Sequence, residues 1–223
     1  MAAKFKNVVT EIDTTGSGQL LLRCPTGKVI IIKNIIVHNA NASNSSFFLA
    51  FEDNSISTSS FPIAAGTTTA GAETVFLFPF VLEENDEILL QTSVADQNVT
   101  LHYAELDAGV RQKYRMICKS LTTADSADSF LTCPAGSTII VNLTSFCNLS
   151  GGTASNNVFT ITDSSASATK TIDKGSIASN GSANFHRTFV LESGDSLNFT
   201  PDEQPFTVYT SFLEIKNPPI RGQ

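Results

Sequence analysis

Residues 22–32 read LRCPTGKVIII, and residues 131–141 read LTCPAGSTIIV. Both stretches place Cys-Pro-x-Gly between a leucine and a run of apolar, mostly β-branched residues, and they lie 109 residues apart. Proline followed two residues later by glycine is turn chemistry, because proline fixes φ and glycine tolerates a positive φ. The β-branched run favours an extended strand. Each stretch therefore predicts one strand, a tight turn and a second, buried strand.

The offset of 109 residues recurs along the chain, which indicates an internal duplication. Phe80-Val81-Leu82-Glu83 recurs as Phe189-Val190-Leu191-Glu192. Single residues repeat at the same offset: Cys24 and Cys133, Asn39 and Asn148, Asp86 and Asp195, Val99 and Val208, Glu105 and Glu214. Only the polar middle differs, since Asp53 matches Asp163 at an offset of 110. Loops tolerate such one-residue changes.

The duplication predicts two domains in the 223-residue chain, residues 1–108 and residues 109–223. Ala108-Gly109 follows the last predicted strand of the first copy, so the linker is short. Each copy has about 100 residues, which is enough to bury a core without metal or disulfide.

Each copy is predicted to contain short strands separated by turns, without helical periodicity. The first copy gives strands at Gln19–Arg23, Lys28–Asn39, Phe47–Glu52, Thr74–Phe80, Glu87–Thr92 and Asn98–Leu106. The second gives strands at Ser129–Thr132, Thr138–Asn148, Asn157–Thr162, Asn184–Leu191, Ser196–Thr200 and Thr207–Ile215. The apolar run from Val29 to Val37 predicts a central strand covered on both faces, with a bend or bulge near Lys33-Asn34. Asn85 and Gly194 are equivalent turn residues that tolerate positive φ.

This pattern predicts an all-β protein of two tandem antiparallel β-sandwich domains. The number of strands fits a jelly roll or an immunoglobulin-like sandwich, and chain order alone does not separate the two. We expect the jelly-roll form.

Composition excludes several partners. The chain has 14 Lys and Arg against 21 Asp and Glu, a net charge of −7, and no basic cluster. It therefore lacks the footprint of a nucleic-acid-binding protein, and an anionic membrane surface is disfavoured for the same reason. No apolar run approaches the ~20 residues of a spanning helix. Charged residues make up only 16% of the chain, against about 25% in a typical soluble domain, so the surface is neutral and hydrogen-bonding.

The N-terminus, Met1-Ala2-Ala3-Lys4-Phe5-Lys6, has no apolar segment typical of a secretory signal, so we expect synthesis in the cytoplasm. The four cysteines have no CxxC spacing, which argues against zinc and against a redox motif. We expect Cys24, Cys118, Cys133 and Cys147 to be free, buried thiols.

The three histidines are not predicted to form a metal or catalytic site. His38, His102 and His186 fall on separate predicted strands. The equivalent positions in the other copy hold Cys147, Ser211 and Leu77. A site older than the duplication would tend to appear twice, so we interpret these histidines as structural or surface residues.

The acidic residues cluster in predicted turns, at Glu83-Glu84, Asp86-Glu87, Asp107 and Asp202-Glu203. A general acid needs a carboxyl with a raised pKa in a pocket, whereas we expect these carboxylates to be solvated. Calcium is disfavoured because no loop has the alternating acidic ligands of a dedicated site. Glu105 and Glu214 share a register in the last strands, and we interpret them as edge or interface charges rather than ligand contacts. The sequence thus predicts no catalytic, cofactor-binding or metal residues and no enzyme.

Two segments, Leu131-Thr132-Cys133-Pro134-Ala135-Gly136 and Val190-Leu191-Glu192-Ser193-Gly194-Asp195, carry a resemblance to a known group of proteins. They resemble turn motifs of small β-sandwich modules in structural proteins of tailed bacteriophages. The first copy departs from the pattern at Thr26 and Glu84-Asn85. The resemblance covers nearly the whole chain, twice, but turn motifs specify a fold more than a function.

The resemblance implies a non-enzymatic virion component, assembled in the host cytoplasm. It would be a capsid decoration or cement protein, or a tail-associated adaptor or fibre-base protein. Its partners would be the major capsid protein or tail proteins, together with further copies of itself. Two similar domains would bind multivalently and so raise avidity. The longest polar stretches, Ser55–Ala72 and Asp163–Asn184, are the expected contact loops.

The alternative function is a glycan-binding module that recognises a host surface. Such a site needs aromatic side chains beside polar groups. The chain has no Trp and only three Tyr (Tyr103, Tyr114 and Tyr209), which disfavours this reading and leaves phenylalanine as the aromatic residue available.

Overall fold

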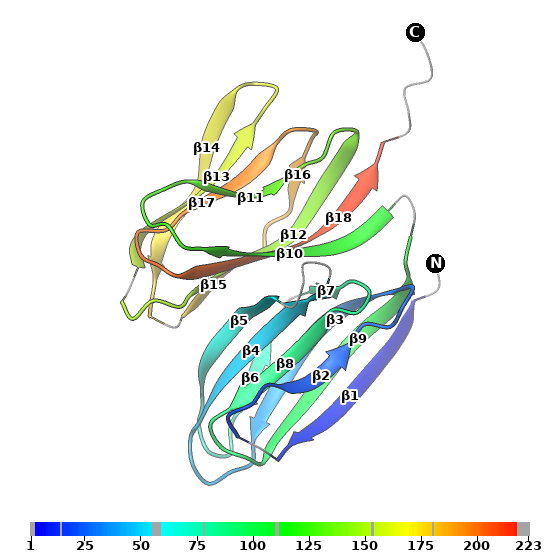
Figure 1. The fold of residues 1–223 in the computed structure, drawn as a ribbon, viewed down its shortest axis with the longest axis vertical. Helices are drawn as coiled ribbons and strands as arrows, with labels where there is room; N and C mark the ends of the chain where they lie inside the picture. Colours follow the sequence, from blue (N-terminus) through cyan, green and yellow to red (C-terminus); the bar gives the residue numbers. More distant parts are fainter. Residues whose placement is uncertain are drawn as a thin grey trace. The chain divides into compact units, whose positions relative to one another are not determined.

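The structure is a computed structural model, and it describes residues 3–13, 15–54, 59–77, 79–109, 112–152, 154–179 and 181–217. These residues form strands and turns, in two compact units, Met1–Ala108 and Gly109–Gln223 (Figure 1). No helix in the described part of the chain is long and apolar enough to cross a membrane.

Unit 1 is a sandwich of two antiparallel sheets. Its strands are β1 (Lys4–Ile12), β2 (Gln19–Arg23), β3 (Lys28–Asn39), β4 (Ser45–Asp53), β5 (Ser59–Thr68), β6 (Glu73–Phe76), β7 (Phe80–Leu82), β8 (Glu87–Thr92) and β9 (Gln97–Asp107). One sheet has the order β1-β9-β3-β6, with β7 also pairing with β3, and the other has the order β2-β8-β4-β5. Because β6 and β7 pair with successive parts of β3, they fill one strand position.

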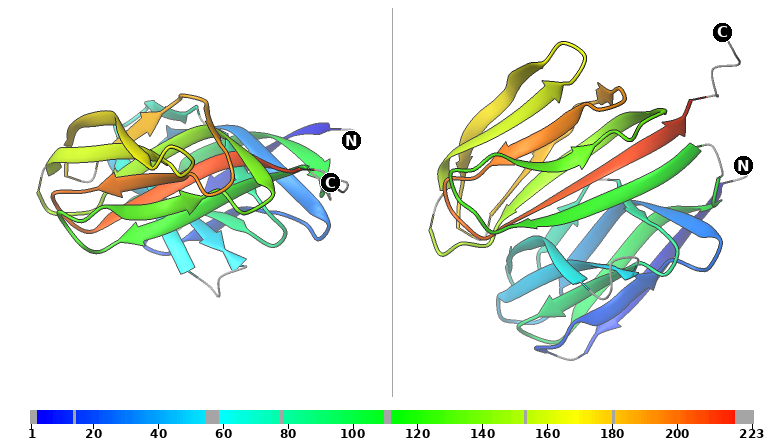
Figure 2. Two further views of the ribbon diagram at one scale, coloured as in Figure 1. Left: turned by 90° about the horizontal axis from the view of Figure 1, so that it is seen from above. Right: turned by 45° about the horizontal axis from the view of Figure 1, so that its top comes forward.

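Unit 2 repeats this arrangement strand for strand. Its strands are β10 (Gln112–Leu121), β11 (Asp128–Thr132), β12 (Ser137–Asn148), β13 (Ala154–Asp163), β14 (Ala168–Ile177), β15 (Ser182–Phe185), β16 (Phe189–Leu191), β17 (Ser196–Thr200) and β18 (Phe206–Lys216). The sheets have the orders β10-β18-β12-β15, with β16 also on β12, and β11-β17-β13-β14. Figure 2 shows the same strands from two further directions, with the β13–β14 hairpin in yellow.

The topology in both units is the jelly roll. Counting the split strand once, each unit has eight strand positions in two sheets. The chain crosses from one sheet to the other at every connection except the β4–β5 hairpin and its counterpart β13–β14. This pattern confirms the predicted all-β fold of two tandem sandwiches and favours the jelly roll over the immunoglobulin-like alternative.

The duplication extends to backbone details. The pairing of β3 with β9 shifts between Ile32 and Asn34, which confirms the bulge predicted near Lys33-Asn34. The pairing of β12 with β18 shifts between Val141 and Leu143, 109 residues later. Such bulges bend a strand and increase its twist. The duplication therefore preserves this local bend along with the strands.

The predicted turn residues also behave as expected. Asn85 has a φ of 70° and Gly194 has a φ of 90°, so both turns use the left-handed region. In the Cys-Pro-x-Gly turns, Gly27 and Gly136 share a φ of 71°. Asparagine and glycine are the residues that reach this region at least cost.

The cores differ in character. Unit 1 buries aliphatic side chains such as Ile30, Ile32, Ile35 and Leu49 between its sheets, along with Phe51 and Phe80. The core of unit 2 is richer in aromatic residues: Phe130, Phe146, Phe159, Phe199, Phe206 and Phe212. Alternate residues of each strand point inward, as the period of two requires.

Four strands were not predicted as strands, and each of them is the end strand of its sheet. β1 and β10 were not predicted, and β5 and β14 fall within the stretches expected to be contact loops, Ser55–Ala72 and Asp163–Asn184. That loop expectation is wrong over β5 and β14, whereas residues 69–72 and 164–167 are turns or irregular segments. Residues 55–58 and 180 lie outside the described residues. Edge strands carry polar residues on their exposed positions, so the sequence of β14 is typical of a loop although most of the strand pairs with β13.

Two further predictions fused separate strands. The segments Thr74–Phe80 and Asn184–Leu191 were each expected as one strand, but each contains parts of two short strands, β6 and β7 in the first and β15 and β16 in the second. The break lets both halves pair with the same long strand around its bulge.

Candidate functional site

The turn between β7 and β8 is held by the buried side chain of Asp86. Its Oδ2 accepts a hydrogen bond from the amide of Glu83 at 2.9 Å, and its Oδ1 accepts one from the amide of Asn54 at 3.2 Å. Asp86 is only 3% exposed, so the prediction that this carboxylate is solvated is wrong. Burial raises the pKa of the Asp86 carboxyl to about 7, and the neighbouring carboxyl of Asp53 adds to the rise.

Asp195 makes the same pair of hydrogen bonds in unit 2, both at 2.9 Å. A second buried residue repeats in the same way. The Nδ2 of Asn39 donates to the carbonyl oxygens of Ser43 at 2.9 Å and Thr68 at 3.1 Å. Asn148 makes the equivalent two bonds at 3.0 and 2.9 Å. We call Asp86, Asp195, Asn39 and Asn148 the turn clamps, because their side chains satisfy the backbone of their own unit.

Glu105 and Glu214 each form an ion pair with the strand beside them. Glu105 on β9 contacts Lys6 on β1 at 2.6 Å, and Glu214 on β18 contacts Arg115 on β10 at 3.0 Å. The hydrogen bond from Lys6 lowers the pKa of Glu105. The two carboxylates therefore pin the edge strands β1 and β10 to their sheets.

The histidines are distributed over separate elements, with His38 on β3, His102 on β9 and His186 between β15 and β16. Among the described residues, no group of three or more His, Cys, Asp or Glu side chains is placed to hold a metal ion. Two cysteines, Cys24 and Cys133, are free thiols within the cores of their units.

Three further acidic residues of the predicted turns, Asp107, Asp202 and Glu87, also contact their own unit. Asp107 pairs with Lys28 at 2.5 Å, and Asp202 accepts a hydrogen bond from the amide of Asn156 at 2.7 Å. Glu87 is buried and pairs with Arg23, which corrects the prediction that it is solvated. The structure thus places these sequence-predicted carboxylates in backbone contacts and ion pairs.

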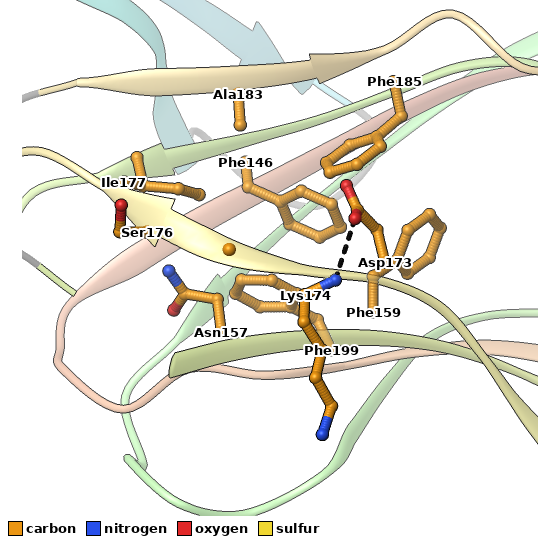
Figure 3. A pocket seen from close by; sticks show the side chains of 11 residues that line it. Phe146, Asn157, Phe159, Asp173, Lys174, Ser176, Ile177, Ala183, Phe185 and Phe199 are labelled. Carbon is orange, nitrogen blue, oxygen red and sulfur yellow. Dashed lines mark hydrogen bonds between the residues drawn. The ribbon is translucent and has the colours of Figure 1, made fainter. Parts of the chain in front are cut away.

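The feature best suited to bind a ligand is a cavity of about 100 Å³ between the two sheets of unit 2 (Figure 3). It lies beside the edge strands β14 and β15. Four aromatic rings line it: Phe146, Phe159, Phe185 and Phe199. Phe146 and Phe199 come from opposite sheets and stack at a centroid distance of 3.9 Å. The main chain at Gly175, on β14, forms part of the wall.

Asn157, on β13, is the buried polar residue of this cavity. It is 4% exposed, and its Nδ2 donates to the carbonyl of Ala154 at 3.2 Å. Its Oδ1 is buried and has no hydrogen-bond partner in the structure. An unsatisfied buried acceptor costs about 1–3 kcal/mol, so this oxygen favours any ligand that brings a donor.

In unit 1 the position equivalent to Asn157 holds Phe47, whose ring lies over Gly66. Phe47 pairs with Gly66 across β4 and β5, as Asn157 pairs with Gly175 across β13 and β14. The ring of Phe47 packs edge-on against Phe76, with centroids 5.5 Å apart. The cavity of unit 2 therefore arises where an amide replaces a phenylalanine ring.

The amino-acid pattern alone did not indicate this cavity. The available signal was a difference between the copies at equivalent positions of β4 and β13, where Phe47 corresponds to Asn157. The one-residue change of offset in this region concealed the equivalence, and only the strand register establishes it.

Unit 1 carries a shallow groove on the outer face of the sheet β2-β8-β4-β5. Two adjoining hollows of about 400 and 290 Å³ share Phe48 and Gln91 as lining residues. Glu52 and Ser60 line the smaller hollow. The groove combines an aromatic ring with hydrogen-bonding side chains.

No protein-family model matches the chain, and no curated protein sequence matches it. Solved structures of similar fold include the major capsid protein of Sulfolobus turreted icosahedral virus, with 8% identity over 96% of this chain and 97% of that one, at a TM-score of 0.39. The major capsid protein of bacteriophage PM2 is 10% identical over 100% of both chains, at a TM-score of 0.37.

A third similar structure is the glycosylasparaginase PNGase F from Flavobacterium meningosepticum. It is 10% identical over 96% of both chains, at a TM-score of 0.48. An enzyme therefore stands among the similar structures, which contradicts the prediction that the chain is not an enzyme. Identities of this size concern the fold alone, and fold does not determine function.

Proposed function

We propose that this chain is a structural component of a tailed-phage particle. In this role it binds neighbouring virion subunits as a capsid decoration or cement protein, or as a tail-associated adaptor or fibre-base protein. The proposal is supported by the resemblance of its turns to phage structural modules. The carrying observation is that buried polar residues common to both copies contact their own unit: the turn clamps bond to its backbone, and Glu105 and Glu214 form ion pairs within it. What the duplication preserved is therefore the fold of each unit.

The contact surface we assign to the partner subunit is the edge strand β1. Phe5 is 79% exposed and Val9 is 68% exposed, and they lie on one face of the strand because they are four residues apart. β1 is also the end strand of its sheet. An open strand edge with exposed apolar side chains is a surface that other proteins cover.

A glycan-binding function is the second candidate, and the groove of unit 1 favours it. The ring of Phe48 lies in a groove that Glu52 and Gln91 also line, and this supplies the combination of aromatic and polar groups that such a site needs. In this function Phe48 would supply the aromatic platform, since the chain has no Trp and only three Tyr.

The proposed function is tested on particles of the virus that encodes the chain. Mass spectrometry and cryo-electron microscopy of purified virions should find the protein at a fixed, repeated position. The double variant Phe5→Ser/Val9→Ser should reduce occupancy at least tenfold, whereas Val190→Ser, at another exposed apolar residue, should leave it unchanged. Absence from virions, combined with binding to a polysaccharide array that Phe48→Ala abolishes, would overturn the proposal in favour of the second candidate.

A further inference from the structure

The cavity of unit 2 has the dimensions of one ring. Its volume is about 100 Å³, well below the roughly 300–1,000 Å³ of pockets for larger ligands. Apolar cavities of about 150 Å³ lined by aliphatic and aromatic side chains bind benzene. The residue that fills the same space in unit 1 is itself an aromatic ring, that of Phe47. The volume of the cavity and the ring of Phe47 at the equivalent place in unit 1 both indicate that the ligand is a six-membered aromatic group.

The walls of the cavity suit the faces and edges of such a ring. Phe146 contacts Phe159 and Phe185 edge-on, at centroid distances of 5.1 and 5.4 Å. Aromatic rings prefer these edge-to-face and offset arrangements with further rings. A ring bound here would join an existing aromatic cluster.

The cavity also has room for the ring to enter without a backbone clash. A Cβ atom built on Gly175 meets nothing within 4 Å, so the space over this strand is open. Ser176, the next residue of β14, is exposed, whereas Ile177 is buried. The ring can therefore reach the cavity from the side of the edge strand β14.

The buried amide of Asn157 favours an aromatic ring that carries a hydrogen-bond donor over a plain hydrocarbon ring. Asn157 Oδ1 is a buried acceptor without a partner, while Nδ2 of the same side chain is engaged by Ala154. A hydroxyl group on the ring would donate to this oxygen and remove its desolvation cost. A plain hydrocarbon ring would leave that cost in place.

We propose that the cavity of unit 2 is a binding site for a phenol, with the ring among the four phenylalanines and the hydroxyl donating to Asn157 Oδ1. The phenol is either a free small molecule or the side chain of a tyrosine on a partner. This inference stands apart from the proposed virion role, because it concerns one cavity and not the particle.

The test measures binding of p-cresol, phenol and toluene to the full chain by ligand-observed NMR. We expect p-cresol and phenol to bind, and toluene to bind about tenfold more weakly, since the missing hydrogen bond is worth about 1.4 kcal/mol. Asn157→Leu should bring phenol and toluene to equal affinity. Asn157→Phe should abolish binding of all three, because it places the ring of unit 1 into unit 2.

The matched control is Asn156→Ala, which changes the exposed neighbour of Asn157 and should leave every affinity unchanged. Thermal unfolding verifies that each variant is folded, and Asn157→Phe should unfold at the same or a higher temperature than the wild type. A short peptide with a central tyrosine, compared with its phenylalanine counterpart, identifies the source. Binding of the tyrosine peptide indicates a partner side chain, and binding of free phenols alone indicates a small molecule.

Two results would overturn the inference. The first is equal binding of p-cresol to the wild type and to Asn157→Phe, which would place the ligand elsewhere. The second is no detectable binding of any of the three rings to the folded wild type.

Discussion

Gly66 lies under the ring of Phe47, so closely that a Cβ atom on the glycine would stand 3.0 Å from Cζ of the ring. The equivalent glycine of unit 2, Gly175, meets nothing within 4 Å. The two glycines occupy the same register position on β5 and β14. Glycine is therefore required by packing in one copy and not in the other.

This contrast predicts opposite effects of one substitution. Gly66→Ala should destabilise unit 1 by about 1–2 kcal/mol, because the ring of Phe47 must move out of a packed position. Gly175→Ala should leave unit 2 unchanged or stabilise it by up to about 1 kcal/mol, since alanine loses less conformational entropy on folding. Urea unfolding followed by NMR signals assigned to each unit measures the two effects separately. Equal destabilisation of both units would contradict the role of Phe47.

The central strands, the turns and the jelly-roll class could be predicted from sequence because their signals are local. The apolar run of β3 predicted that this strand is buried and bulged. Asn85 and Gly194 predicted the positive φ of their turns. Repetition at a fixed offset supplied a second, independent reading of each of these elements.

The edges and the cavity could not be predicted, for physical reasons. β14 is held by backbone pairing with β13, and its side chains are mostly exposed and polar, so hydrophobic periodicity gives no signal. The burial of Asp86 depends on the amide of Asn54, which is distant in sequence. The cavity depends on which residue of β13 faces Gly175, and register across strands is a tertiary property.

The turn clamps should be costly to remove. Asn39 holds two carbonyl oxygens, and its own Oδ1 accepts a hydrogen bond from Gln97 Nε2 at 2.7 Å. Asn39→Ala removes a partner from the two buried carbonyl oxygens, at about 1–3 kcal/mol for each, whereas Gln97 Nε2 keeps its bond to the carbonyl of Ala95. We expect a loss of about 2–4 kcal/mol of unit 1 stability by urea unfolding.

Asn148→Ala should cause a loss of similar size, confined to unit 2. The control is Asn41→Ala at a half-buried turn side chain near the clamp, with a cost below about 1 kcal/mol. If Asn39→Ala unfolds no more easily than this control, the clamp does not stabilise the fold.

The thiol of Cys24 should be inert in the folded protein. Burial raises the pKa of Cys24 to about 12, and only the thiolate is a nucleophile. Iodoacetamide at pH 8 should therefore leave Cys24 unmodified until the unit unfolds. Burial also raises the pKa of Cys133, so this thiol should report on unit 2 in the same way. Mass spectrometry of the peptides at increasing urea concentrations measures both; labelling of Cys24 in native buffer within minutes would contradict the expectation.

Unit 1 should lose stability as pH rises from about 4 to about 7. Burial, reinforced by Asp53, raises the pKa of folded Asp86 to about 7, whereas an unfolded aspartate titrates near about 3.9. Between these values the folded state keeps a proton that the unfolded state has released, so folding is favoured at the lower pH and the advantage disappears above pH 7. NMR titration of the Asp86 carboxyl carbon, with urea unfolding at pH 5 and pH 8, measures both effects. Asp53→Asn removes the like charge and should lower the midpoint and reduce the pH dependence. A midpoint near 4 in the wild type would contradict this prediction.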